Sequence, residues 1–182
     1  TRIGRISIVR GLATYMVRLG HKAYIFPAAS ISIDRYSYVP YIFSEVELKN
    51  IFTVCDNYPV SDVSPKRHLI IPLLFRILYG CGLRISEALN LKLKDVDLGQ
   101  GTLFIQDTKF RKERKIPMTE VMTRRCRLYL EGNHRLDNSD AFLFPSPYGG
   151  YYKESTIYKL FREILWKAGI SHSGKGPRLH DL

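Results

Sequence analysis

Apolar residues recur at helical spacing along five stretches of the chain, and this pattern predicts a mainly helical protein. Two stretches begin at capping signals, because Ser44 and Glu47 form an S-x-x-E capping box and Thr119 precedes the fourth stretch. Glycines 20 and 169 end the first and last stretches. The expected helices run up to Gly20, over 45–56, over 67–79, over 120–132 and from Ser155 to Gly169.

A short segment between the third and fourth stretches combines a backbone break with a candidate functional residue. Gly80 and Gly82 predict a sharp break, since glycine reaches backbone angles that other residues avoid. Apolar residues then return at helical spacing and can face a core: Ile85, Ala88, Leu89 and Leu91. Arg84 opens this second segment. It is either an anion-binding side chain or a solvated residue at a helix start, and the pattern leaves both interpretations open.

Two short alternating segments predict a β-hairpin. Thr102–Gln106 and Arg114–Met118 are the expected strands, and residues 107–113 form a basic tip between them. Turn-forming residues over 95–101 precede the first strand. The predicted fold class is therefore mainly α with a small antiparallel β-sheet, an α+β arrangement.

The helical and polar stretches divide the chain into three parts. Residues 1–27 form a basic segment that contains the first helix, residues 28–43 form a linker with proline, serine and tyrosine, and the main domain covers 44–182. The chain starts inside a helical pattern and stops where residues 178–182 predict the opening of another helix. We expect it to be a piece of a longer protein.

The charge balance indicates a polyanionic partner, of which nucleic acid is the usual one. The 182 residues carry a net charge of +11, with a pI near 9.7. Residues 109–127 hold eight Lys or Arg against two Glu, and residues 1–27 hold no Asp or Glu at all. Such runs are also typical of solvated helix faces, so they do not identify the partner by themselves.

Other function classes find little support in the sequence. The five histidines and three cysteines lack the spacing of metal ligands, and the odd number of cysteines suggests reduced thiols of an intracellular protein. No apolar run approaches the length of a membrane span, and no signal peptide is visible. We therefore expect no metal, no cofactor and no membrane partner.

Three motifs, in order along the chain, resemble those of the tyrosine recombinases, the phage integrase family. Residues 82–89 are similar to the G-L-R-x-S-E-L box, and 109–117 match the hairpin signature K-x-x-K-x-R-x-x-P. Residues 180–182 resemble the start of the H-x-L-R-H box. The resemblance covers nearly the whole chain, and it implies the family's catalytic-domain fold over 44–182. The helix within 1–27 would then be the last one of the arm domain that clamps DNA.

The resemblance also implies a role for each matching residue. Arg84 would grip the scissile phosphate, which suits a guanidinium because it stays charged and binds two oxygens at once. Lys109 would protonate the leaving 5′ oxygen as general acid, with Lys112 a weaker candidate. His180 would act as a general base or as a donor to the phosphate. Glu87 would support Arg84 structurally. In the family, a second arginine, a His or Trp and the nucleophilic tyrosine follow this point.

The implied function is site-specific DNA breakage and rejoining through a 3′-phosphotyrosine, which requires neither ATP nor metal. Expected partners are double-stranded DNA and, in the parent protein, three further copies in a tetramer in the cytoplasm. Five tyrosines then serve packing or DNA contact: Tyr129, Tyr148, Tyr151, Tyr152 and Tyr158. The residues expected to contact DNA are Arg5, Arg10, Arg18, Arg111, Arg114, Lys153, Lys159 and Arg178. The alternatives are a non-catalytic DNA-binding regulator and a helical module that binds RNA or an acidic protein.

Overall fold

The computed structural model describes residues 2–27, 39–106, 113–134, 138–174 and 176–182. The chain forms two compact units, Thr1–Val39 and Pro40–Leu182. The first unit contains helix α1 (Arg2–Arg18), which ends where Gly20 takes a positive φ of 84° and donates its N–H to the Val17 carbonyl. The predicted first helix and its end at Gly20 are thus confirmed.

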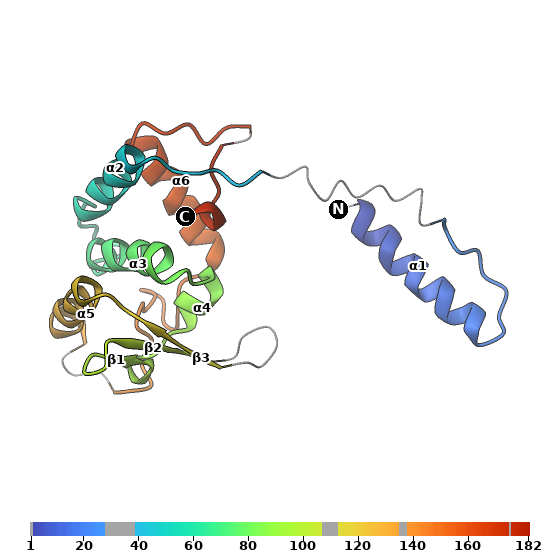
Figure 1. The fold of residues 1–182 in the computed structure, drawn as a ribbon, viewed down its shortest axis with the longest axis horizontal. Coiled ribbons are helices and arrows are strands. Elements are labelled where there is room, and N and C mark those ends of the chain that lie inside the picture. The colour runs from blue at the N-terminus through green and yellow to red at the C-terminus, as the bar shows by residue number, and fades with distance from the viewer. Residues whose placement is uncertain (1, 28–38, 107–112, 135–137, 175) are drawn as a thin grey trace. The chain divides into compact units, whose positions relative to one another are not determined.

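The second unit is mainly helical with one small antiparallel sheet, which confirms the predicted fold class (Figure 1). Its helices are α2 (Glu45–Asp56), α3 (Arg67–Cys81), α4 (Ile85–Asn90), α5 (Glu120–Asn133) and α6 (Glu154–Lys167). Its strands are β1 (Val96–Asp97), β2 (Thr102–Ile105) and β3 (Arg114–Pro117). The described residues also form the short 3-10 helices η2 (Leu93–Asp95) and η3 (Leu179–Asp181).

Two helices of this unit begin at the predicted capping residues. The Ser44 hydroxyl accepts the Glu47 N–H at 3.2 Å, and the Glu47 carboxylate accepts the Ser44 N–H at 2.8 Å, so the capping box is complete. The Thr119 hydroxyl accepts the Met122 N–H at 3.2 Å at the start of α5. Tyr41, just before the first box, also donates its hydroxyl to Glu47. These caps explain why α2 and α5 start where the sequence predicts.

The core of the second unit is built from buried residues of α2, α3, α4, α5, α6 and strand β2. Seven of the fifteen residues of α3 are buried, and the rings of Phe75 and Phe161 stack with their centroids 5.7 Å apart. The residues predicted to form the inner face of α6 are all buried: Ile157, Leu160, Phe161, Ile164 and Leu165. Burial of each such side chain stabilises the folded state by about 1.5–3 kcal/mol. The core therefore fixes the position of α4, whose apolar residues pack into it.

The backbone break before α4 involves only one of the two glycines from which it was predicted. Gly82 caps α3 in the left-handed region, with φ 60° and ψ 35°. Gly80 instead lies inside α3, which corrects the prediction for that residue. A Cβ at Gly80 would lie 3.1 Å from the Cε atom of Met122 on α5. We infer that Gly80 allows a close approach of α3 and α5.

The sheet confirms the predicted hairpin and adds one strand. Strands β2 and β3 pair antiparallel, with Thr102 opposite Pro117 and Ile105 opposite Arg114. The predicted turn is present as well, since the Asp97 carboxylate accepts the N–H groups of the two residues that follow Leu98. Strand β1 was not predicted, because two residues are too few to show an alternating pattern.

Candidate active site

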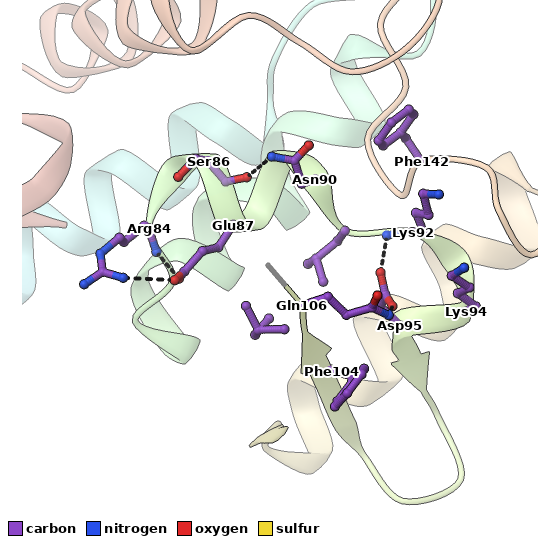
Figure 2. Close-up of a pocket in the computed structure, with 12 residues that line it drawn as sticks. Arg84, Ser86, Glu87, Asn90, Lys92, Lys94, Asp95, Phe104, Gln106 and Phe142 are labelled. Atoms are coloured by element: carbon purple, nitrogen blue, oxygen red, sulfur yellow. Dashed lines mark hydrogen bonds and ion pairs between the residues drawn. The ribbon is translucent and has the colours of Figure 1, made fainter. Parts of the chain in front are cut away.

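Arg84 stands at the N-terminal end of α4, directly after the break at Gly82. Its backbone is extended, with φ −66° and ψ 149°, and the next residue, Ile85, is buried in the core. Its side chain remains 63% exposed. The turn thus anchors the helix through an apolar neighbour while the guanidinium stays available to an anion (Figure 2).

Glu87 holds Arg84 and ties α4 to the hairpin. Its carboxylate accepts the Arg84 N–H at 3.0 Å and the Arg84 Nη1 at 3.2 Å. Arg114 of β3 approaches the same carboxylate with two parallel bonds, Nη1 at 3.0 Å and Nη2 at 2.8 Å. The Glu87 side chain is only 6% exposed. One nearly buried carboxylate therefore fixes the start of α4 and the first residue of β3 together.

Electrostatics within this cluster keep Glu87 ionised. Hydrogen bonds from Arg114 lower the pKa of Glu87 below its usual value, and the Arg84 N–H and the two positive charges add to this against the opposing effect of burial. The same pairing raises the pKa of Arg114. Both guanidinium ends of Arg114 are directed at Glu87, so the structure gives Arg114 a positioning contact in addition to the DNA contact predicted for it.

A hollow of about 630 Å³ lies beside Arg84 and Glu87 (Figure 2). Its wall carries two further cations, Lys92 and Lys94, which lie 3.5 Å and 2.7 Å from the Asp140 carboxylate. Asp95 is buried in the wall, where it accepts the Lys92 N–H at 2.9 Å and the Gln106 side-chain amide at 2.6 Å. The wall of the hollow thus presents Arg84, Lys92 and Lys94 beside two carboxylates that are hydrogen-bonded within the protein, and the exposed guanidinium of Arg84 is the group best placed to meet a phosphate.

His180 lies on η3 and contacts α6. Its Nε2 atom is 2.7 Å from the Tyr158 hydroxyl, and the two rings meet edge to face. His180 and Tyr158 line a second hollow, of about 400 Å³. None of the residues lining this hollow also lines the hollow beside Arg84, so the convergence of His180 and Arg84 on one phosphate stays a prediction.

The predicted hairpin-tip residues Lys109, Arg111 and Lys112 lie outside the described residues, and their roles stay predictions. The structure does describe both ends of the hairpin, where Ile105 pairs with Arg114. Through the Arg114–Glu87 bonds the second strand of the hairpin is attached to the segment that carries Arg84. The tip-side end of β3 is therefore held close to the candidate phosphate-binding arginine.

The other residues predicted to contact DNA lie on both units. On α1, Arg5 and Arg18 are exposed, and the Arg10 Nε donates to the Phe26 carbonyl at 2.9 Å. Of the residues of the second unit that were predicted to contact DNA, Lys153, Lys159 and Arg178 are exposed. Exposure is compatible with phosphate contact but also with a solvated surface, so these assignments stay predictions.

Two contacts of the site were missed by sequence reasoning. Arg114 was predicted to contact DNA, and Tyr158 to serve packing or DNA contact. The structure shows that each faces another candidate site residue, Glu87 and His180 respectively. The place of Arg114 in the hairpin signature was the available signal for the first contact. Nothing in the sequence pointed to the second, because Tyr158 and His180 are 22 positions apart.

Within the described part of the chain, no group of three or more His, Cys, Asp or Glu side chains could hold a metal ion. The same residues include no helix with the length and apolar character that a bilayer span requires. The cysteines are present as thiols, and burial raises the pKa of Cys55 and of Cys126 to about 12. Neither thiol is therefore a nucleophile at neutral pH.

Comparison with known proteins identifies the family. Residues 42–182 match the phage integrase family. The integrase/recombinase y4rB of Sinorhizobium fredii is 29% identical over 98% of this chain and 59% of its own length. Tyrosine recombinase XerC of Oceanobacillus iheyensis is 32% identical over 73% of this chain and 43% of its own length.

A solved structure agrees with these relatives. The site-specific recombinase XerH, bound to its difH substrate in a pre-cleavage complex, superposes with a TM-score of 0.64 at 25% identity. The match covers 97% of this chain and 50% of XerH. This chain thus spans about half the length of the proteins it resembles. Since the matched region includes α4, the hairpin strands and η3, the chain belongs to the phage integrase family of tyrosine recombinases.

Proposed function

We propose that this chain binds duplex DNA as part of a tyrosine recombinase, and that the parent protein cuts and rejoins DNA at specific sites through a 3′-phosphotyrosine. The observation that carries the proposal is the Arg84–Glu87–Arg114 cluster at the edge of the hollow. It presents an exposed guanidinium whose position is set by a nearly buried carboxylate. Family membership supplies the reaction class, and the cluster supplies a site where a phosphate can bind.

The geometry suits charge stabilisation at a phosphodiester. Among the described residues, Glu87 is the partner of the Arg84 side chain, and it engages only Nη1. The other donors of the guanidinium are therefore available to the two non-bridging oxygens, on which charge accumulates during attack. Because Glu87 fixes Arg84 in advance, little reorganisation is needed when that charge develops. The site can therefore stabilise the charge that develops on a phosphodiester.

The other roles follow from the family resemblance and belong to the same proposal. Lys109, or Lys112 in its place, protonates the leaving 5′ oxygen, and His180 assists at the phosphate. The eight basic residues assigned to DNA contact in the sequence analysis bind the DNA backbone, and the parent protein works as a tetramer on DNA in the cytoplasm. In the family, the second arginine and the nucleophilic tyrosine follow the position that His180 occupies here.

Salt-dependent DNA binding tests the proposal on the chain itself. Affinity for a fluorescent duplex should fall steeply with salt, because each neutralised phosphate contributes a slope of about 0.9 in log Kd against log salt. Arg84→Ala should weaken binding about tenfold and reduce that slope by about one. Arg124→Ala, which removes an exposed arginine of α5, is the matched control and should change neither quantity.

Two outcomes would contradict the proposal. A shallow salt dependence would favour a module that binds RNA or an acidic protein. Equal effects of Arg84→Ala and Arg124→Ala would remove the phosphate-binding role of Arg84. The gene sequence decides between a recombinase and a non-catalytic regulator: an Arg-His pair directly after Leu182 and a tyrosine some tens of codons later support the enzyme, and their absence supports the regulator.

A further inference from the structure

Tyr158 meets His180 in a way that can control the imidazole. The phenol oxygen lies 2.7 Å from Nε2, and the ring centroids are 5.8 Å apart at an interplanar angle of 75°. Tyr158 itself is well held, since it is half-buried, packs against the core and lies on α6 between the buried residues Ile157 and Phe161. His180, by contrast, is exposed on a short 3-10 turn. A rigid phenol therefore supports a more accessible imidazole.

We propose that Tyr158 is a positioning residue that donates its hydroxyl proton to Nε2 of His180 and thereby places the imidazole proton on Nδ1. The inference rests on the proposed function, because it concerns how His180 meets a phosphate. A neutral imidazole has one donor and one acceptor nitrogen, and the partner of one nitrogen decides the state of the other. With Nε2 accepting from the phenol, Nδ1–H is the donor that remains.

The direction of the bond follows from the chemistry of the two groups. A neutral imidazole nitrogen is a good acceptor, and the phenol keeps its proton at neutral pH. Burial raises the pKa of Tyr158, with a smaller effect from Glu154, which strengthens that preference. No other hydrogen-bond partner competes for the Tyr158 hydroxyl among the described residues. The proton of this hydrogen bond therefore belongs to Tyr158.

This arrangement decides between the two roles that the family resemblance leaves open for His180. A general base needs a lone pair directed at the proton that it removes. In the proposed tautomer the Nε2 lone pair is occupied by the phenol, and Nδ1 carries a proton. The free nitrogen can donate to a phosphate oxygen but cannot accept a proton. Tyr158 therefore makes His180 a phosphate donor rather than a base.

Nitrogen NMR of the whole chain tests the tautomer directly. Long-range proton–nitrogen correlation spectra of the 15N-labelled protein, recorded at a pH where imidazoles are neutral, distinguish protonated from unprotonated ring nitrogens. His180→Gln assigns the His180 signals by difference. We expect a protonated Nδ1 and an unprotonated Nε2. In Tyr158→Phe, which removes a single oxygen, the Nε2–H form should increase at the expense of the Nδ1–H form.

Tyr148→Phe provides the matched control, because it removes a hydroxyl from a tyrosine that is 84% exposed. It should leave the His180 signals unchanged. A protonated Nε2 in the wild-type chain would overturn the proposal. So would a tautomer that does not respond to Tyr158→Phe, because another group would then determine it.

A second measurement links the tautomer to DNA. Tyr158→Phe should weaken duplex binding about threefold, the size expected for one neutral hydrogen bond. In a His180→Gln background the same change should have no further effect, whereas additive losses would contradict a role exerted through His180. Failure of the wild-type chain to bind DNA would instead refute the proposed function, and the nitrogen signals would still decide the tautomer.

Discussion

Replacing Glu87 with glutamine tests whether the carboxylate organises the candidate active site. The substitution keeps the shape of the side chain but removes its charge, and it puts an amide donor where an acceptor stood. Glu87 accepts four hydrogen bonds of 3.2 Å or less, two from Arg84 and two from Arg114. With glutamine, some of these donors would face an N–H₂ group instead of an oxygen. We expect both arginines to lose their fixed positions.

The expected loss of unfolding free energy depends on how deeply each of the three side chains is buried. A hydrogen bond to a charged group contributes about 1.5–3 kcal/mol, and loss of a buried ionic partner costs about 3–5 kcal/mol. Glu87 is 6% exposed, but the Arg114 and Arg84 side chains are 38% and 63% exposed, so water replaces part of what they lose. We therefore expect Glu87→Gln to lower the free energy of unfolding by about 2–3 kcal/mol. The melting temperature should fall by about 5–10 °C.

Urea denaturation followed by circular dichroism measures the effect for Glu87→Gln, Arg114→Met and the double variant. The two single changes should not add, because both remove the same pair of bonds. The expected coupling energy is about 1–2 kcal/mol. Asp140→Asn makes the same chemical change at an exposed ion pair with Lys94, and it should leave the denaturation midpoint unchanged.

Additive losses would refute the reasoning, because they would mean that Glu87 and Arg114 stabilise the fold independently. An effect of Glu87→Gln no larger than that of Asp140→Asn would refute it as well. In that case burial would not have strengthened the pair, and the position of Arg84 would need another explanation.

Three further outcomes follow from the structure. The lowered pKa of Glu87 means that the stability contributed by its ionised form is fully present above the ordinary value of 4.5 and is lost as the pH falls through the lower folded value. The difference in unfolding free energy between wild type and Glu87→Gln, measured in urea at several pH values, should therefore narrow as the pH falls below 4.5. Gly82→Ala should cost about 1–2 kcal/mol in the same assay, because φ is 60° there, and an unchanged midpoint would contradict the left-handed turn. Iodoacetamide should modify the partly exposed Cys81 of the native protein well before Cys55 and Cys126, as read by mass spectrometry of peptides.

Much of the fold could be predicted because its signals are local. The capping box at Ser44, the cap at Thr119 and the glycine after α6 each act within one helical turn, so each can be recognised in the sequence. The role of Gly80 could not be predicted, because it depends on a methionine more than forty positions away on α5. Strand β1 depends in the same way on its pairing with β2.

In the candidate site, too, residues with local sequence signals could be predicted, and residues that depend on long-range contacts could not. Arg84 could be identified because the residues around it form a recognisable box. Its support could not, since the Glu87–Arg114 pair joins positions 27 apart that are brought together only by the hairpin. Tyr158 gave no signal for a similar reason, because its spacing to His180 depends on the loop between α6 and η3. Residue types indicate the chemistry that is available, and tertiary contacts decide which groups hold it in place.

The attachments of α4 have a consequence for how the protein emerges from the ribosome. At the C-terminal end of α4, the Leu91 carbonyl accepts the Leu143 N–H at 2.8 Å. At the N-terminal end, Glu87 is held by its bonds to Arg114. Neither partner exists while α4 itself is being synthesised. The nascent helix therefore stays without its final supports for about fifty more residues, and its apolar face is open to non-native contacts during that interval.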